Sequence, residues 1–246
     1  MKNNETPVGW SVCMSDDSFL DNLSDIPKKI NSRKFVSGGI LYCPAFGGFY
    51  DNVFAIKMPT TVIFSKVNGT LSVDSSPNLE PKAKYESFFS IEQDENGFSI
   101  QVILNNMFVS DKPYTTIETF PPILHRVRND IIYLNGRFDC HAWQRPVHFG
   151  FRITKEVFDE MKPTDKIIFN QDEVVMYVRL NTPDNSEVKL YQLSPDDEKE
   201  LMKFVNRNVN LISYVSLMDF RTIWNRVRNR RPNKFLRDLN YGSKSN

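Results

Sequence analysis

The chain has 246 residues, of which 40% are hydrophobic and 25% charged, and its formal net charge is +1; this excludes a disordered chain, which would lack apolar residues to bury. No apolar run approaches the roughly 18 residues of a membrane-spanning helix, and the polar residues 1–10 lack the apolar stretch of a secretion signal. Three cysteines are too few for a disulfide framework, so the sequence predicts a soluble, cytoplasmic protein without membrane contact.

Hairpin signals recur through the first half of the chain. Residues 61–73 have strand propensity on both sides of Asn68-Gly69, a dipeptide that tolerates the positive φ angles of a two-residue turn. Similar patterns predict a second hairpin around residues 94–97 and a third around Asn135-Gly136. Each of these segments is therefore expected to pair with its neighbour in the sequence.

Farther along, the pattern of alternating apolar residues continues and a short helix interrupts it. Residues 147–153 alternate as a half-buried strand does. A helix is expected to begin after Thr154, whose hydroxyl can cap it, and to end before Pro163. Residues 165–169 and 174–180 then read as another pair of strands.

These signals predict four regions along the chain. Residues 1–8 are expected to be disordered, and residues 9–181 to form a β-rich sandwich or partly open barrel. After a polar, turn-forming boundary, residues 187–231 are expected to form a second unit, followed by a basic tail at 232–246. The overall prediction is an α+β protein.

The second unit reads as one short strand and two helices. Residues 187–193 have strand propensity, and Ser194-Pro195 combines a good N-cap with a residue favoured at the first helical position. An apolar stripe at helical spacing follows at residues 201–205. A second helix is expected to begin at Ser213 or Ser216 and to end at Pro232.

The β-α-α pattern from strand 187–193 to residue 231 resembles the ribbon-helix-helix family of DNA-binding proteins. The resemblance implies a homodimer, since a lone strand on two helices buries too little apolar area. It also implies that two paired strands enter the major groove of double-stranded DNA. Packing Val188 and Leu190 inward would turn Lys189 and Tyr191 toward the bases, and a register change of one residue would expose Gln192 instead.

The same resemblance places the start of the second helix beside the DNA backbone, where free N–H groups bind phosphate. Residues 213–246 carry eight basic and two acidic residues, a net charge of +6 against −5 for the remainder, which suits an anionic partner. The DNA-binding residues predicted in this way are Lys189, Tyr191, Gln192, Ser213, Ser216, Arg228, Arg230, Arg231 and Lys234.

A large chain ending in such a unit is also similar in arrangement to transcriptional activators of conjugative-plasmid transfer. The resulting expectation is a dimeric, sequence-specific transcriptional regulator, an activator if that likeness holds, with no enzymatic activity and no cofactor. The sequence does not predict its operator.

Three alternatives stand beside this expectation. Strands 174–180 and 187–193 could form one intramolecular hairpin, so that the two helices would be ordinary architecture. The protein could instead be a virion or other assembly protein, whose β-rich domain carries the interaction and whose basic C-terminus docks on a neighbour. Cys140, with His125, His141 and His148 nearby in sequence, supplies the residue types of a metal or cysteine enzyme, although no paired cysteine motif accompanies them.

Overall fold

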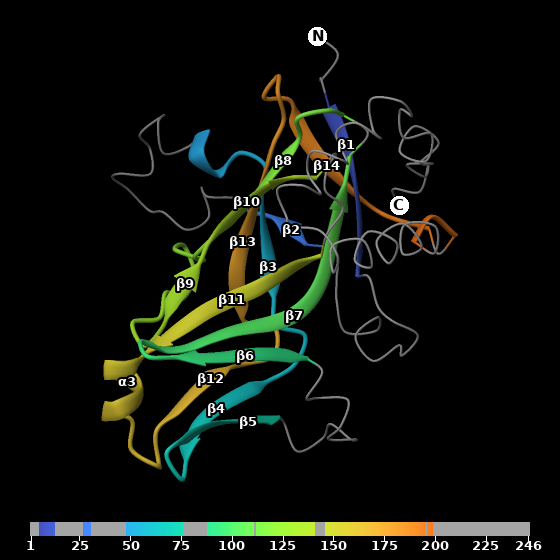
Figure 1. Ribbon diagram of the computed structural model, residues 1–246. Helices are drawn as coiled ribbons and strands as arrows, with labels where there is room; N and C mark the ends of the chain where they lie inside the picture. Colours follow the sequence, from blue (N-terminus) through green and yellow to red (C-terminus); the bar gives the residue numbers. More distant parts are fainter. Residues whose placement is uncertain are drawn as a thin grey trace, which may run out of the picture.

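The computed structural model describes residues 5–12, 27–30, 48–75, 88–110, 112–140, 146–194 and 196–198. Most of these residues lie in strands (Figure 1). The elements are β1 (Glu5–Val12), β2 (Lys28–Lys29), a 3-10 turn η3 (Gly48–Tyr50), β3 (Val53–Lys57), β4 (Val62–Val67), β5 (Thr70–Ser75), β6 (Phe89–Asp94), β7 (Gly97–Val109), β8 (Thr116–Phe120), β9 (Ile132–Leu134), β10 (Gly136–Asp139), β11 (Val147–Thr154), α3 (Lys155–Glu160), β12 (Lys166–Phe169), β13 (Val174–Asn181) and β14 (Glu187–Gln192).

The strands form three sheets. Sheet A has six strands in the order β14-β1-β7-β11-β9, with β6 paired separately to β7. Sheet B has the order β10-β8-β13-β3-β2, and sheet C the order β12-β4-β5. Figure 1 shows β7 and β11 running the length of sheet A, with sheet C below and the strands of sheet B behind.

One core joins the three sheets. Phe64 from sheet C lies 5.3 Å, centroid to centroid, from Phe151 of sheet A, and both rings are fully buried. Phe169 of sheet C contacts Phe151 in turn, at 5.2 Å. Sheet B adds buried aliphatic residues such as Ile117 and Val178 to the same cluster. Aromatic rings of this size supply much of the apolar area that stabilises such a core.

Strand β14 overturns the predicted α+β fold. It pairs in parallel with β1 of the same chain, from Glu5 opposite Glu187 to Trp10 opposite Gln192. The described body is therefore mostly β, and strand 187–192 completes sheet A instead of opening a separate β-α-α dimerising unit. Strand propensity predicted the strand correctly, but propensity carries no information about which partner the strand chooses.

The helices predicted after this strand lie outside the described residues, apart from their first turn. Residues 196–198 are helical, and the Ser194 hydroxyl accepts a hydrogen bond from the Asp197 backbone N–H at 3.2 Å. The predicted N-cap at Ser194 is thus confirmed. The intramolecular hairpin of the alternative interpretation is wrong, because β13 lies in sheet B and β14 in sheet A.

Two of the three predicted hairpins are confirmed. Asn68 and Gly69 have φ angles of 51° and 79° and join β4 to β5, while Asp94 pairs with Gly97 in the turn between β6 and β7. The hairpin predicted at Asn135-Gly136 is wrong. There the chain leaves sheet A after β9, which pairs with β11, and enters sheet B as β10, which pairs with β8.

The predicted helix is also confirmed, and the predicted strand pair that follows it is not. Thr154 caps α3 by accepting a hydrogen bond from the Val157 N–H. Both strands after α3 exist, but β12 pairs with β4 in sheet C and β13 pairs with β3 and β8 in sheet B. Among the described residues, no helix is long and apolar enough to cross a membrane.

Asn52 ties sheet B to the outer side of β14. Its side-chain N–H donates to the Ser186 carbonyl at 2.9 Å, and its side-chain oxygen accepts from the Val188 N–H at 2.8 Å. Its own carbonyl accepts from the Leu180 N–H at 3.0 Å. The buried amide of Asn52 therefore provides hydrogen-bond partners for the backbone at the start of β14, as a neighbouring strand would.

Candidate functional site: a groove across two sheets

The crossing from β9 to β10 lies between two hollows of the described surface. Thr119 of β8 holds this crossing, because its hydroxyl accepts from the Gly136 N–H at 2.8 Å and lies 3.4 Å from the Gly136 carbonyl. These hydrogen bonds fix the place where the connection enters sheet B. A concave surface forms on each side of the connection.

The two concave surfaces, each with a volume of about 370 Å³, share Thr119, Asn135 and Gly136. We call them together the surface groove. One end lies on sheet A and includes Ser90, Glu92, Gln101, Leu134, His148 and Gly150. Its other end lies on sheet B and includes Phe49, Glu118, Phe120, Arg137 and Arg179. Volumes of this size are at the lower limit of known small-molecule sites.

A glycine opens the floor of the groove. Gly150 of β11 pairs with Leu134 of β9, and a Cβ atom built on Gly150 would lie only 3.3 Å from the Leu134 Cβ. A side chain at this position would therefore fill the hollow. Strand β11 is paired on both sides, with β7 and with β9, so the backbone of the floor is already occupied by the sheet's hydrogen bonds.

Several polar side chains of the groove make no hydrogen bond or ion pair with any described residue. They come from β6, β7 and the β9–β10 crossing, and all of them are exposed. They are Ser90, Glu92, Gln101 and Asn135. Hydroxyl, carboxylate and amide groups arranged around one hollow are available to a ligand.

The end of the groove on sheet B has a different character. The Arg179 guanidinium lies 4.5 Å from the centre of the Phe49 ring and 5.7 Å from that of Phe120, and its Nε donates to Glu118 at 2.8 Å. This hydrogen bond lowers the pKa of the Glu118 carboxyl. Arg137 is 64% exposed, with a nitrogen 3.7 Å from Glu118. Two guanidinium groups face one carboxylate, which leaves this end with a positive charge.

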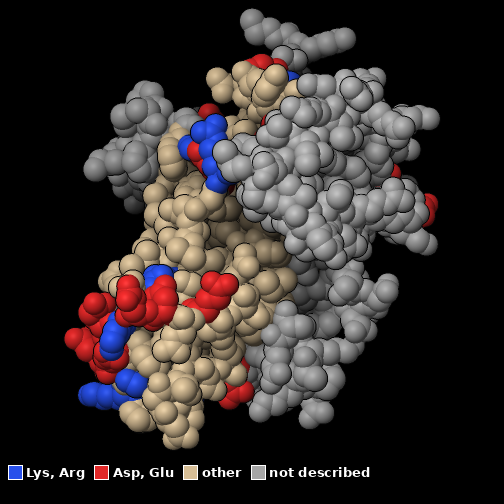
Figure 2. Space-filling model, viewed as in Figure 1, with Lys and Arg blue, Asp and Glu red and all other residues tan. Residues whose placement is uncertain are grey.

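Charged side chains form two groups on this face of the molecule. Figure 2 shows one group at the lower left, over α3 and the β6–β7 turn, where acidic side chains lie among basic ones, and a smaller mixed group above it. Uncharged side chains lie between the two groups. The acidic members of the lower group include Asp94, Glu95, Glu156, Asp159 and Glu160, of which Asp94 and Asp159 are paired with cations.

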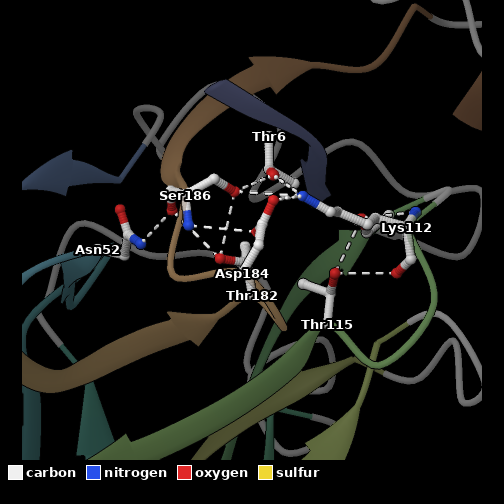
Figure 3. Close-up of polar contacts among 8 residues, drawn as sticks. Thr6, Asn52, Lys112, Thr115, Thr182, Asp184 and Ser186 are labelled. Carbon is white, nitrogen blue, oxygen red and sulfur yellow. Dashed lines mark hydrogen bonds and ion pairs between the residues drawn. The ribbon is translucent and has the colours of Figure 1, made fainter. Parts of the chain in front are cut away.

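A second polar cluster lies where the loop before β14 meets β1 (Figure 3). The Lys112 ammonium donates to Asp184 at 2.6 Å and to Thr6 at 3.0 Å, and it lies 3.3 Å from the Ser186 hydroxyl. A Ser-Lys pair can act as a nucleophile and base only if the amine is unprotonated. Here the Lys112 nitrogen is paired with the Asp184 carboxylate, and Ser186 is 6% exposed. The cluster therefore serves to join β1 to the β13–β14 loop.

The metal or cysteine centre of the third alternative is not assembled in the part of the chain that the structure describes. Burial raises the pKa of the Cys140 thiol, which donates to the Thr115 carbonyl at 3.3 Å. The His125 ring is hydrogen-bonded to the Tyr177 hydroxyl, and burial lowers the pKa of this histidine. Among the described residues, no three His, Cys, Asp or Glu side chains gather as metal ligands do. His141 lies outside those residues.

The predicted DNA-binding residues divide between β14 and the part of the chain that is not described. As the sequence predicts, Val188 is buried and Leu190 packs on the core, so Lys189 points outward, with its nitrogen 5.5 Å from the Tyr191 ring. Gln192 is exposed. The remaining predicted residues lie outside the described ranges: Ser213, Ser216, Arg228, Arg230, Arg231 and Lys234.

The surface groove was missed by sequence reasoning, since its members are scattered among eight elements and no motif unites them. Comparison of the chain with protein-family models, with curated proteins and with solved structures finds no match. The ribbon-helix-helix resemblance and the functions expected from it stay predictions.

Proposed function

We propose that this protein is a non-catalytic binding component of a larger assembly. Its β-rich body holds a ligand in the surface groove, and its basic segment, residues 213–246, docks on a neighbouring copy. The observation that carries this proposal is the groove itself, a hollow of two joined parts lined by polar side chains without partners among the described residues.

Rigid strands support the groove on both sides. Its polar side chains stand on β6 and β7 and on the crossing that Thr119 anchors to Gly136. A site built on paired strands needs little ordering when a ligand arrives, so more of the contact energy is available for binding. This favours reversible binding as the role of the β-rich body.

The charge distribution supports docking between copies. Residues 213–246 carry a net charge of +6 and residues 1–212 a net charge of −5. The acidic side chains over α3 and the β6–β7 turn offer a complementary surface on a neighbouring molecule (Figure 2). Attraction of this kind between exposed charges weakens as salt is added.

The same basic residues also support a competing proposal, in which the protein is a DNA-binding regulator. That function no longer has a shared ribbon to support it, because β14 is bonded to β1 of its own chain. Duplex binding through the basic segment alone would be independent of sequence and strongly dependent on salt. The two proposals therefore differ in partner, and one experiment separates them.

The experiment compares the full chain with two variants that remove equal charge. One replaces four basic-segment residues with Gln: Arg228, Arg230, Arg231 and Lys234. The matched control replaces four exposed cations of the body with Gln: Lys28, Arg126, Lys162 and Lys166.

Sedimentation at low and high salt is expected to show self-association of the full chain and of the control. Both should weaken about tenfold or more as salt rises, and the basic-segment variant should associate poorly at any salt. A full chain that stays monomeric at all salts refutes the assembly proposal. If that monomer also retards duplex DNA with a steep salt dependence, the partner of the basic segment is DNA and not a second copy of the chain.

A further inference from the structure

We infer that the ligand of the surface groove is a short oligosaccharide. This inference rests on the proposed function and names the ligand class of the same site. It follows from three properties of the groove, which are the chemistry of the side chains without described partners, the occupied backbone of the floor, and the charge at the end formed by sheet B.

The available side chains suit a ligand rich in hydroxyl groups. The amides of Gln101 and Asn135 each offer donors and an acceptor, Ser90 offers a hydroxyl, and Glu92 offers acceptors only. A sugar hydroxyl can donate and accept at once, so it can satisfy every member of this set. A purely apolar ligand would leave these donor and acceptor groups desolvated and without hydrogen-bond partners.

The β11 floor of the groove cannot bind an extended peptide by strand addition. A peptide that adds to a sheet needs a free strand edge for its backbone hydrogen bonds. Strand β11 has none, since β7 pairs with one side and β9 with the other. The apolar surface is shallow as well, with Leu134 48% exposed and Phe49 37% exposed. Such surfaces can pack against the C–H faces of a sugar ring, whereas a peptide anchor needs an enclosed apolar pocket.

The charges at the two ends of the groove favour one orientation of the bound oligosaccharide. Arg137 and Arg179 face one carboxylate at the end on sheet B, and Glu92 stands at the end on sheet A. A sugar that carries a carboxylate is therefore placed beside Arg137, where a charge-assisted hydrogen bond can form. Neutral sugars occupy the part near Gln101 and Glu92.

The test uses the full chain on an immobilised array of short neutral and uronic-acid-containing oligosaccharides, and in parallel on a library of displayed peptides. Two variants remove groove amides, Gln101→Ala and Asn135→Ala. The matched control is Gln93→Ala, an exposed glutamine on the neighbouring strand β6 that faces the other side of sheet A. A fourth variant, Arg137→Gln, probes the charged end.

Each groove variant is expected to weaken binding of the selected oligosaccharide about tenfold, and the control less than about twofold. Arg137→Gln should weaken binding of acidic sugars and leave that of neutral sugars unchanged. Thermal unfolding of all four variants should match that of the unmodified chain, because none of these side chains holds the core.

Two results overturn the inference in different ways. Peptides that bind the full chain and are lost in the Gln101 and Asn135 variants, with no sugar bound, refute the oligosaccharide and leave the binding function standing. Sugars or peptides that bind equally to the groove variants and the control, or no binding of either class, refute both the ligand and the groove's role in the proposed function.

Discussion

Asn52 provides the sharpest test of how the strand at residues 187–192 is held. Its buried side chain satisfies the Val188 N–H and the Ser186 carbonyl, and its φ angle of 56° lies in the left-handed region. Asn52→Gly keeps this backbone conformation accessible and removes both hydrogen bonds. Asn52→Ala removes the bonds as well, and alanine is less favourable than glycine in the left-handed conformation.

The expected loss of stability depends on which hydrogen bonds the Ser186 carbonyl and the Val188 N–H keep in the variants. The Ser186 carbonyl still accepts from the Thr182 hydroxyl at 3.2 Å, so it loses one of two bonds. The Val188 N–H is left without a partner in the described structure, at a cost of about 1–3 kcal/mol. Together the free energy of unfolding should fall by about 2–4 kcal/mol in Asn52→Gly and by about 1–2 kcal/mol more in Asn52→Ala.

Urea unfolding measures these losses, and Asn185→Gly is the matched control. Asn185 has nearly the same φ angle, 52°, but its side chain is exposed. The control should therefore stay within about 0.5 kcal/mol of the unmodified chain. Amide exchange at Val188 should also accelerate in Asn52→Gly. Equal stability of Asn52→Gly and Asn185→Gly would refute the bridging role.

Three further predictions concern single side chains of the body. The hydrogen bond from Lys112 holds the pKa of Asp184 below its ordinary value. This carboxylate therefore stabilises the fold above about pH 4, and the stabilisation is lost as pH falls. Unfolding midpoints measured from neutral to acid pH should depend less on pH in Asp184→Asn than in the unmodified chain. Arg128→Met should lower the free energy of unfolding by about 2–4 kcal/mol, because the Asp130 carboxylate loses its ion-pair partner. In denaturant titrations, the double variant with Asp130→Asn should regain part of this loss. Cys140 should resist a thiol reagent in the native protein and react after unfolding, as peptide mass mapping can show, because its thiol is buried and its pKa is raised.

Local structure could be predicted from the sequence where neighbouring residues decide it. The Asn68-Gly69 turn, the cap at Thr154 and the alternation of β11 depend on residues close in the chain. Asn135-Gly136 shows the limit of this reasoning. The dipeptide permits positive φ angles but adopts none here, because each flanking strand finds a better partner elsewhere, β9 in sheet A and β10 in sheet B.

The surface groove could not be predicted for a related reason. Its members come from Phe49 to Arg179 and meet only after sheets A and B have formed and packed together. No periodicity links Gln101 to Asn135. A glycine such as Gly150 indicates only a weakened strand as long as the neighbouring strand, here β9, is not known. Pairing between distant strands therefore decides both the fold and the site.

The parallel pairing of β1 with β14 is the clearest case, and Gly9 makes it testable. A Cβ atom built on Gly9 would lie 2.5 Å from a methyl carbon of Leu193 and 2.9 Å from one of Val109, so Gly9→Ala forces these side chains to move and should cost about 1–3 kcal/mol. Leu193→Ala creates space at the same place and should cost about 2–4 kcal/mol alone. If residues 9 and 193 are neighbours in solution, the double variant should lose at least about 1 kcal/mol less than the sum of the two single losses. Simple additivity in urea titrations would show that β14 does not lie beside β1, and the correction of the predicted α+β fold would then fail with it.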